Sequence, residues 1–412
     1  MREDKRTFNE IGLYLSFGNG KAPDLSGDGA FPVYGSNGVI GRSKSANHEH
    51  SIILGRVGAY CGSVYFEDGK YWATDNTIVV KVSKGNEAKF FYNLLKAYPL
   101  RSLAGGSAQP LINQTIIKRI EAWVPPLPTQ RKIAAILTAY DDLIEVNKRR
   151  IALLENMAEE IYREWFVRLR FPGHQRTRFV KGVPEGWPFE IGTAFFDHVK
   201  GKSYASHEIS DEDGACFFIT LKSFHRRGGY RKEGLKYFSG SYKKGQSVEA
   251  GDVVMAVTDM TQDRAVVGEV ARIPKLHGKK AVISLDVIRL MPKNMSTTFL
   301  YTYMRYSGFA NYIKQFANGA NVLHLKPDLV GRQKLLFPPA DLRDRFSVLI
   351  EPFYQEVDAL ERANGVLTKT RDLLLPRLIS GKLTVEELDI QFPPSMQDQP
   401  LTPTSANEDC HA

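Results

Sequence analysis

Apolar residues recur at heptad spacing through residues 129–166, a stretch that contains neither Gly nor Pro. Two adjacent columns of the pattern form one narrow stripe, which consists of Ile133, Leu137, Tyr140, Ile144, Asn147, Ile151, Leu154, Ala158, Ile161 and Trp165. This spacing predicts a long helix with a single apolar seam. At about 1.5 Å per residue the helix would be roughly 55 Å long, so it needs a partner along its length. The alternative is an amphipathic helix on a domain surface, but such helices are usually shorter.

The same pattern returns in residues 341–380, where Phe346 lies 213 positions after Ile133. The seam of this second helix consists of Phe346, Ile350, Phe353, Val357, Leu360, Asn364, Leu367 and Leu374. Gly319 follows Gly106 by the same 213 positions, so the chain contains two copies of one unit, each a globular part followed by a long helix. A twofold axis between the copies makes the helices antiparallel. It also places Asn147 opposite Asn364, where the two amides can hydrogen-bond to each other.

The expected fold class is α/β, with two globular α/β domains joined by a long antiparallel two-helix coiled coil in a pseudo-twofold repeat. The domain boundaries follow from the repeat and from composition. We expect a first domain at 1–128, a helix at 129–166, a basic linker at 167–186, a second domain at 187–340, a helix at 341–380 and a disordered, acidic, Pro-rich tail at 381–412. Short apolar runs predict strands at 51–54, 63–66, 77–82, 121–124, 217–221, 252–257, 265–271 and 282–290, and apolar periodicity predicts helices at 88–98 and 297–316.

Charge and cysteine content narrow the classes of function. The 412 residues carry a net charge of +9, and no Lys or Arg follows Lys382, so the body of the chain is more basic than the total. A basic body suits a polyanionic partner. The three cysteines, Cys61, Cys216 and Cys410, are widely spaced, which disfavours disulfides and zinc sites and fits a reducing cytoplasm. The N-terminal stretch has no apolar segment and no long apolar run follows, so we expect neither a signal peptide nor a membrane span.

Sequence patterns for catalysis are missing. Methyl transfer to an exocyclic amine commonly uses an Asn/Asp-Pro-Pro-aromatic turn, but none of the Pro pairs at 125–126, 338–339 and 393–394 has those neighbours. The chain also has no Gly-rich phosphate loop with Lys and Ser/Thr. His48 and His50 stand without a Cys or His cluster, so a solvated turn is the better interpretation than a metal site. We therefore expect no catalytic residue, no metal and no cofactor on this chain.

Candidate DNA contacts are chosen by chemistry, because Lys and Arg neutralise phosphates while Asn, Gln and Arg read base edges. In the first half they are Tyr34, Ser36, Asn37, Arg42, Lys44, Arg56, Gln109 and Asn113. In the second half they are Lys200, Lys202, Lys222, Arg226, Arg227, Tyr230, Arg231, Lys236, Arg264, His324 and Lys326. For each cation the alternative is a solvated surface charge, and for residues 224–232 it is a mobile basic loop without a role.

Several stretches, taken in this order, resemble the specificity (S) subunit of Type I restriction-modification enzymes. They are Tyr34-Gly35-Ser36-Asn37-Gly38, Tyr71-Trp72-Ala73-Thr74-Asp75 and residues 124–133, 251–260 and 373–383, and the overall pattern covers all but the tail. The resemblance implies that each globular part is a target recognition domain for one half of a split DNA site. It implies that the helices space the domains and dock two methyltransferase (M) subunits. Those subunits would bind S-adenosylmethionine and methylate adenine, and a nuclease–translocase (R) subunit can join them.

The resulting hypothesis is a non-catalytic, cytoplasmic subunit that recognises the sequence of double-stranded DNA and has no membrane partner. Two alternatives belong to other classes. One is a modification methyltransferase with its own catalysis, which the missing turn disfavours. The other is a coiled-coil adaptor that does not bind DNA.

Overall fold

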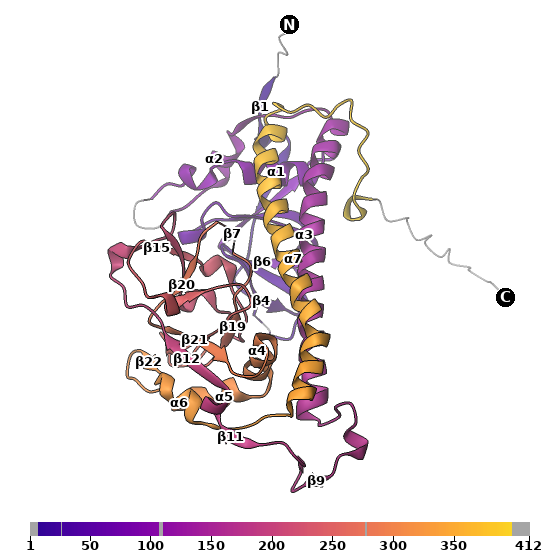
Figure 1. Ribbon diagram of the computed structural model, residues 1–412. Helices are drawn as coiled ribbons and strands as arrows, with labels where there is room; N and C mark the ends of the chain where they lie inside the picture. Colours follow the sequence, from indigo (N-terminus) through magenta and orange to yellow (C-terminus); the bar gives the residue numbers. More distant parts are fainter. Residues whose placement is uncertain (1–6, 26, 107–109, 277, 398–412) are drawn as a thin grey trace, which may run out of the picture. The chain divides into compact units, whose positions relative to one another are not determined.

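The computed structural model describes residues 7–25, 27–106, 110–276 and 278–397 (Figure 1). The chain divides into two compact units. Unit 1 comprises residues 1–147 and 363–412, and unit 2 comprises residues 148–362. Each unit therefore contains one globular part and a portion of each long helix. No helix in the described part of the chain combines the length and apolar character that crossing a membrane requires.

Unit 1 is built around a six-stranded sheet with the order β2-β7-β5-β6-β3-β4. Its strands are β2 (Leu15–Asn19), β3 (Phe31–Gly35), β4 (Gly38–Ser43), β5 (His48–Gly55), β6 (Val64–Ala73) and β7 (Thr77–Val82). Along the central strand β5, Ile52 and Leu54 enter one apolar cluster and Ile53 enters another, because successive side chains point to opposite faces. Helix α1 (Ala88–Ala97) contributes Phe90 and Leu94 to the first of these clusters.

The remaining elements of unit 1 close its core. Strand β1 (Phe8–Glu10) pairs antiparallel with β8 (Glu121–Trp123), and helix α2 (Gln114–Lys118) precedes β8. The short helical turns are η1 (Ile11–Leu13), η2 (Gly58–Tyr60), η3 (Leu100–Leu103) and η12 (Pro394–Met396).

Unit 2 contains a four-stranded sheet, β12-β21-β17-β19, and a five-stranded sheet, β13-β15-β14-β20-β16. Three two-stranded pairs, β10-β9, β11-β23 and β18-β22, complete it. The strands are β9 (Phe179–Val180), β10 (Val183–Pro184), β11 (Phe189–Ile191), β12 (Phe196–Lys200), β13 (Ile209–Ser210), β14 (Cys216–Ile219), β15 (Lys236–Phe238), β16 (Ser247–Val248), β17 (Val253–Ala256), β18 (Thr258–Asp259), β19 (Val270–Arg272), β20 (Ala281–Ile283), β21 (Val287–Pro292), β22 (Leu323–His324) and β23 (Lys334–Leu336). The helices are α4 (Thr297–Tyr306), α5 (Phe309–Ile313) and α6 (Pro327–Arg332), with short turns η5 (His174–Arg176), η6 (Gly192–Ala194), η7 (Ser206–Glu208), η8 (Leu221–Ser223), η9 (Lys232–Gly234), η10 (Lys244–Gln246) and η11 (Lys314–Phe316).

The internal repeat is visible in the topology of the two units. The order β2-β7-β5-β6 in unit 1 matches β12-β21-β17-β19 in unit 2, and the pair β1-β8 matches β11-β23. A parallel pairing also recurs, between β3 and β6 in unit 1 and between β14 and β20 in unit 2. The expected α/β fold class with an internal repeat is therefore confirmed.

The two long helices, α3 (Leu127–Tyr162) and α7 (Ala340–Ile379), pair antiparallel (Figure 1). In unit 1, Asn147 Nδ2 donates to Asn364 Oδ1 at 2.9 Å, and Arg371 forms an ion pair with Asp141. Residue numbers thus fall along α7 as they rise along α3, which is the antiparallel arrangement. The predicted pairing of the two asparagines is confirmed.

All predicted seam residues are buried or half-buried. In unit 1, Ile133 and Leu137 of α3 join Leu378 of α7 in the same apolar cluster as α1. In unit 2, Tyr162 of α3 and Phe346 of α7 join α4 in a second cluster. Each seam therefore merges with the core of a globular part, so each domain is fixed to the helix ends in its own unit.

Several predicted elements differ from the structure; the strand expected at 63–66, for example, extends to Ala73 as β6. Helix α3 begins at Leu127, two residues before the predicted start, because Pro128 lies in the first turn, where a backbone N–H has no partner within the helix. The α-helix ends at Tyr162, and a π-helical turn, η4 (Arg163–Val167), follows it. The predicted helix 297–316 is interrupted by Gly308, whose φ of +85° breaks the helix into α4 and α5. The strand at 282–290 divides at a turn in which Val287 N–H donates to Ser284 O, and the strand at 265–271 is formed only from Val270.

The connector and the beginning of the tail are both more ordered than expected. In the predicted linker 167–186, the Phe171 ring packs on Trp187 with centroids 5.3 Å apart, and β9 and β10 form a hairpin. In the predicted disordered tail, residues 381–397 pack on unit 1, where Val385 is 1% exposed. Apolar side chains scattered among acids and prolines supply this packing, so the expectation of disorder is wrong for these residues.

Candidate nucleic-acid interface

Three segments of unit 1 that are distant in sequence are held together by hydrogen bonds. The Val57 N–H donates at 3.3 Å to Ser36 Oγ, which lies in the turn between β3 and β4. The Gly58 N–H donates to Pro110 O at 3.0 Å, and the Ile112 N–H donates to Arg56 O at 3.0 Å. We call the surface formed by residues 36–37, 56–62 and the described part of 104–113 platform 1.

Unit 2 builds a similar surface from residues 225–230, 259–266 and 317–326, which we call platform 2. The Leu325 N–H donates to Val257 O at 2.8 Å, as Ile112 does to Arg56 in unit 1. Gln262 Nε2 donates to Ala320 O at 2.9 Å and so joins the second segment to the third. The Gly229 N–H donates to Val270 O at 2.8 Å, which attaches the first segment to β19.

Asp259 fixes the central segment of platform 2. Its carboxylate accepts hydrogen bonds from the N–H groups of Val266 at 2.7 Å and Val267 at 3.1 Å, and from both the N–H and the hydroxyl of Thr261. Burial acts to raise the pKa of Asp259, but these hydrogen bonds outweigh it and lower the pKa below its usual value. The carboxylate is therefore an internal acceptor that organises the loop and is not available to a ligand.

The repeated glycines occupy corresponding places in the two platforms. Gly106 has a φ of +94° and Gly319 a φ of +153°, values that residues with a side chain rarely adopt. A Cβ on Gly319 would lie 1.9 Å from Val322 O. The tight chain reversal in the third segment of platform 2 therefore requires glycine, which explains its recurrence at the repeat interval.

The structure assigns different roles to the candidates of the first half. Asn37 and Arg56 lie on platform 1, and Lys44 is exposed at the end of β4. Ser36 and Asn113 hold the loops, since Ser36 bonds to Asn76 O and Asn113 caps α2 by accepting from Ile116 N–H. Gln109 lies outside the described residues.

Tyr34 is unsuited to DNA contact, which corrects one of the candidates, whereas a contact by the exposed Arg42 stays a prediction. Tyr34 is 8% exposed, packs edge-on against Tyr71 and donates its hydroxyl hydrogen to Glu67 Oε2 at 3.0 Å. Burial, reinforced by the Glu67 carboxylate, raises the pKa of the Tyr34 phenol. The Arg42 guanidinium donates to the backbone oxygens of Gly29 and Ala30 and thus serves the turn beside β3.

The second-half candidates divide in the same way. Platform 2 carries Arg226, Arg227, Tyr230, Arg264, His324 and Lys326. Of these, Tyr230 is half-buried against an apolar cluster, so its ring serves the core of unit 2 and the expectation of a DNA contact is wrong. Lys200, Lys202, Lys222, Arg231 and Lys236 lie outside the three segments of platform 2. Lys236 is held by Asp211 at 2.8 Å.

His48 and His50 belong to β5, so the expected solvated turn is wrong. His50 is 3.4 Å from Asp68, and the His48 ring lies 6.0 Å from that of Tyr71. Sequence reasoning also missed Gln262, which joins two segments of platform 2. Its position two residues after the stretch 251–260 could have drawn attention to it.

Comparison with known proteins agrees with this geometry. A family described as Type I restriction modification DNA specificity domain matches residues 12–156. The Type I restriction enzyme MjaIX specificity subunit of Methanocaldococcus jannaschii is 26% identical over 314 residues, covering 74% of this chain and 71% of that protein. The MjaVIII specificity subunit of the same organism is 22% identical over 405 residues, with 92% and 93% coverage. The EcoprrI specificity subunit of Escherichia coli is 34% identical over 114 residues, or 27% of this chain and 28% of that protein.

A solved structure shares the fold. The S subunit of a Type I restriction-modification system from M. genitalium aligns with a TM-score of 0.57 at 17% identity, covering 92% of this chain and 98% of that one. Residues 12–156 thus match the Type I restriction-modification DNA specificity family, and most of the chain is similar to specificity subunits of that family.

Proposed function

We propose that this chain reads DNA sequence as the non-catalytic subunit of a Type I restriction-modification complex, with platform 1 on one half of a bipartite site and platform 2 on the other. The observation that supports this is the construction of one loop platform twice, once in each unit. Arg56 and Asn37 on platform 1, and Arg226, Arg264 and His324 on platform 2, supply the cations and polar groups that phosphates and base edges require.

The long helices would space the two platforms and dock the M subunits. Apolar side chains remain exposed on both helices, away from the seam. In unit 1 they are Leu143, Val146, Val366 and Leu373, and in unit 2 they are Leu153, Met157, Val348 and Leu349. On α3 they follow a second heptad stripe, which suits a helix of another subunit. One such set in each unit fits two M subunits.

The cofactor would belong to those partners. S-adenosylmethionine is expected on each M subunit, and an R subunit would add nuclease and translocation activity. The chain's own contribution is then to place adenines of a duplex in reach of the M subunits. Because its target is DNA, we expect it in the cytoplasm.

Mapping methylated adenines in cells that express this chain with its M subunits tests the proposal. We expect a split motif, and replacing residues 188–335 by the second domain of another specificity subunit should change one half of the motif only. If both halves changed, the assignment of one platform to each half would be wrong.

A second experiment separates the proposal from its two alternatives. The purified chain, incubated with duplex DNA and labelled S-adenosylmethionine but without M subunits, should bind the duplex in a salt-dependent way and transfer no methyl group. Methyl transfer by the chain alone would support a self-contained methyltransferase. Absence of duplex binding, both alone and with M subunits, would support a coiled-coil adaptor.

A further inference from the structure

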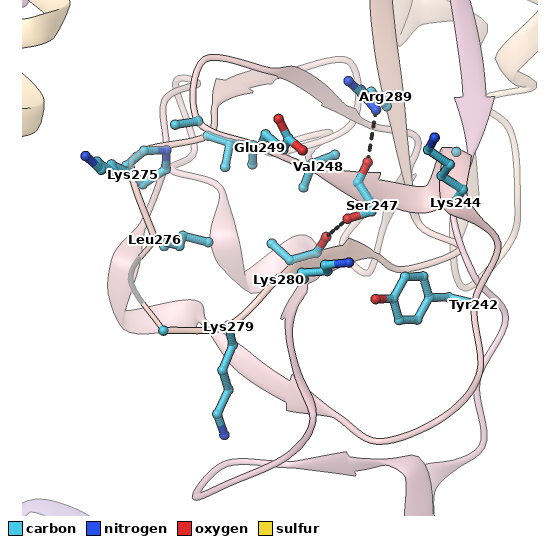
Figure 2. A pocket seen from close by; sticks show the side chains of 16 residues that line it. Tyr242, Lys244, Ser247, Val248, Glu249, Lys275, Leu276, Lys279, Lys280 and Arg289 are labelled. Atoms are coloured by element: carbon cyan, nitrogen blue, oxygen red, sulfur yellow. Dashed lines mark hydrogen bonds between the residues drawn. The ribbon is translucent and has the colours of Figure 1, made fainter.

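An open cleft of about 1210 Å³ lies on unit 2 between residues 242–250 and residues 273–276 and 278–281, with Arg289 at its wall (Figure 2). Strands β16 and β20 pair antiparallel along it, with Ser247 opposite Val282. None of these residues belongs to the three segments of platform 2. The proposed recognition of DNA sequence by platform 2 therefore gives this cleft no role.

Two basic residues of the cleft hold its walls. Arg289 donates to Ser247 O at 3.0 Å and to Asp252 Oδ1 at 2.9 Å, and Figure 2 shows the first of these bonds. Lys279 pairs with Asp213 and lies 5.0 Å from the centre of the Tyr237 ring. Arg289 and Lys279 are both paired with carboxylates of unit 2, so they shape the cleft and leave little charge for a ligand.

Three further lysines of the cleft, Lys244, Lys275 and Lys280, are exposed. Within the described part of the chain, none of the three forms an ion pair with a carboxylate. The acidic residue among those lining the cleft is Glu249. Among the described residues that line the cleft, the three exposed lysines therefore outnumber the one acid, and the lining carries an excess of positive charge. Such an arrangement costs electrostatic free energy unless an anion binds there.

We propose that this cleft binds the sugar–phosphate backbone of duplex DNA, next to the half-site that platform 2 contacts; the proposal rests on the function proposed above. Lysine ammonium groups are mobile point charges, which neutralise phosphates but read no bases. In the cleft wall, Arg289 Nη1 donates to Ser247 O and the Ser247 hydroxyl donates to Ala281 O, so these donors are not available to hold a small molecule. Gly278, with a φ of +91° and open space at its Cβ position, leaves the rim accessible to a bulky strand.

The expected effect is on salt dependence. Each phosphate contact contributes about 0.9 to the slope of log affinity against log salt concentration. The triple variant Lys244→Gln/Lys275→Gln/Lys280→Gln should therefore lower the slope by up to about 2.7. Between about 50 and 200 mM salt the variant would lose roughly 40-fold less affinity than the wild type, from the same relation. Its preference for the correct over a scrambled second half-site should be unchanged.

The experiment uses the full chain assembled with its M subunits and a duplex that carries the methylated motif. A matched control, Lys181→Gln/Arg332→Gln/Lys334→Gln, removes the same charge from exposed positions of unit 2 outside the cleft and platform 2. Thermal melting checks that each variant is folded. Independently of any variant, acetylation of the wild-type complex should be slower at Lys244, Lys275 and Lys280 when the duplex is present.

The outcomes are distinguishable. The inference is overturned, while the proposed function stands, if the cleft variant has the same salt slope as the wild type. The same holds if the cleft variant lowers the slope no more than the control variant does. Loss of half-site preference would overturn it too, because the lysines would then read bases. Protection of the three lysines by M subunits without DNA would assign the cleft to a protein partner and overturn it as well. If the wild-type complex binds no duplex, the proposed function fails together with this inference.

Discussion

A leucine at position 147 would remove the amide whose Nδ2 donates to Asn364 Oδ1 at 2.9 Å. Asn364 would then face an apolar side chain with its own amide unsatisfied. A buried polar group that loses its partner costs roughly 1–3 kcal/mol. Because both asparagines are half-buried, solvent can partly replace the bond, and we expect Asn147→Leu to destabilise the helix pair of unit 1 by about 1–2 kcal/mol.

Changing both asparagines should reverse the loss. In the double variant Asn147→Leu/Asn364→Leu two apolar groups meet in the seam, and replacing both partners of a buried hydrogen bond is often neutral or stabilising. We therefore expect the double variant to be at least as stable as the wild type. The two substitutions would then couple by more than about 1 kcal/mol, whereas independent sites add to within about 0.3–0.5 kcal/mol.

Hydrogen exchange of the backbone amides in residues 140–150 measures the free energy of local opening directly. It suits this chain because a protein with two units need not unfold in one step. Lys148→Leu is the matched control, since it introduces the same side chain at an exposed neighbouring position of α3. Additive effects of the two asparagine substitutions would refute the reasoning, because they would mean that the amide pair contributes nothing as a pair.

Three further perturbations follow from the structure. Gly319→Ala places a methyl group 1.9 Å from Val322 O, so duplex binding assays should show at least tenfold weaker discrimination at the second half-site and unchanged discrimination at the first. Burial, and then the Asp358 carboxylate, raises the pKa of Glu361 from 4.5 to about 7. The stability that the protonated Glu361 carboxyl contributes is thus complete below pH 4.5 and lost as the pH rises through 7. Melting curves should show the stability of unit 2 falling between about pH 4.5 and 7, less so in Glu361→Gln. Val385 is 1% exposed, so Val385→Asp should destabilise unit 1 by about 3 kcal/mol or more and lower the temperature of its melting transition. An unchanged melting transition would mean that residues 381–397 do not stabilise unit 1.

The helix pair was predictable because its signal is periodic and repeated. The seam spacing identified the helices, and the constant interval between the copies identified their antiparallel pairing, including Asn147 with Asn364. The strand β7 (Thr77–Val82) was equally clear from a short β-branched run. The break at Gly308 was not, because a helix pattern runs through it on both sides and a single glycine is tolerated in many helices.

The candidate site was less predictable, since the role of a polar side chain depends on partners that are distant in sequence. Tyr34 sits among glycines and an asparagine and looked exposed, yet Tyr71 and Glu67 enclose it. Arg42 looked free, but its acceptors are the carbonyl oxygens of the turn beside β3. A repeated glycine predicts local structure more directly, because its role depends on backbone geometry and not on distant partners. Gly106 and Gly319 both have a positive φ and both lie in the third segment of their platform.

The packing of residues 381–397 has a consequence for how the chain forms during its synthesis. Unit 2 is one continuous stretch, so all of its residues have been made by position 362. Unit 1 contains the first residues of the chain, yet its apolar cluster also includes Leu378 and Val385. On the ribosome, the core of the globular part that is synthesised first therefore stays incomplete until residues 378–385 emerge. A nascent chain halted before position 385 would therefore leave apolar surface of unit 1 exposed to chaperones.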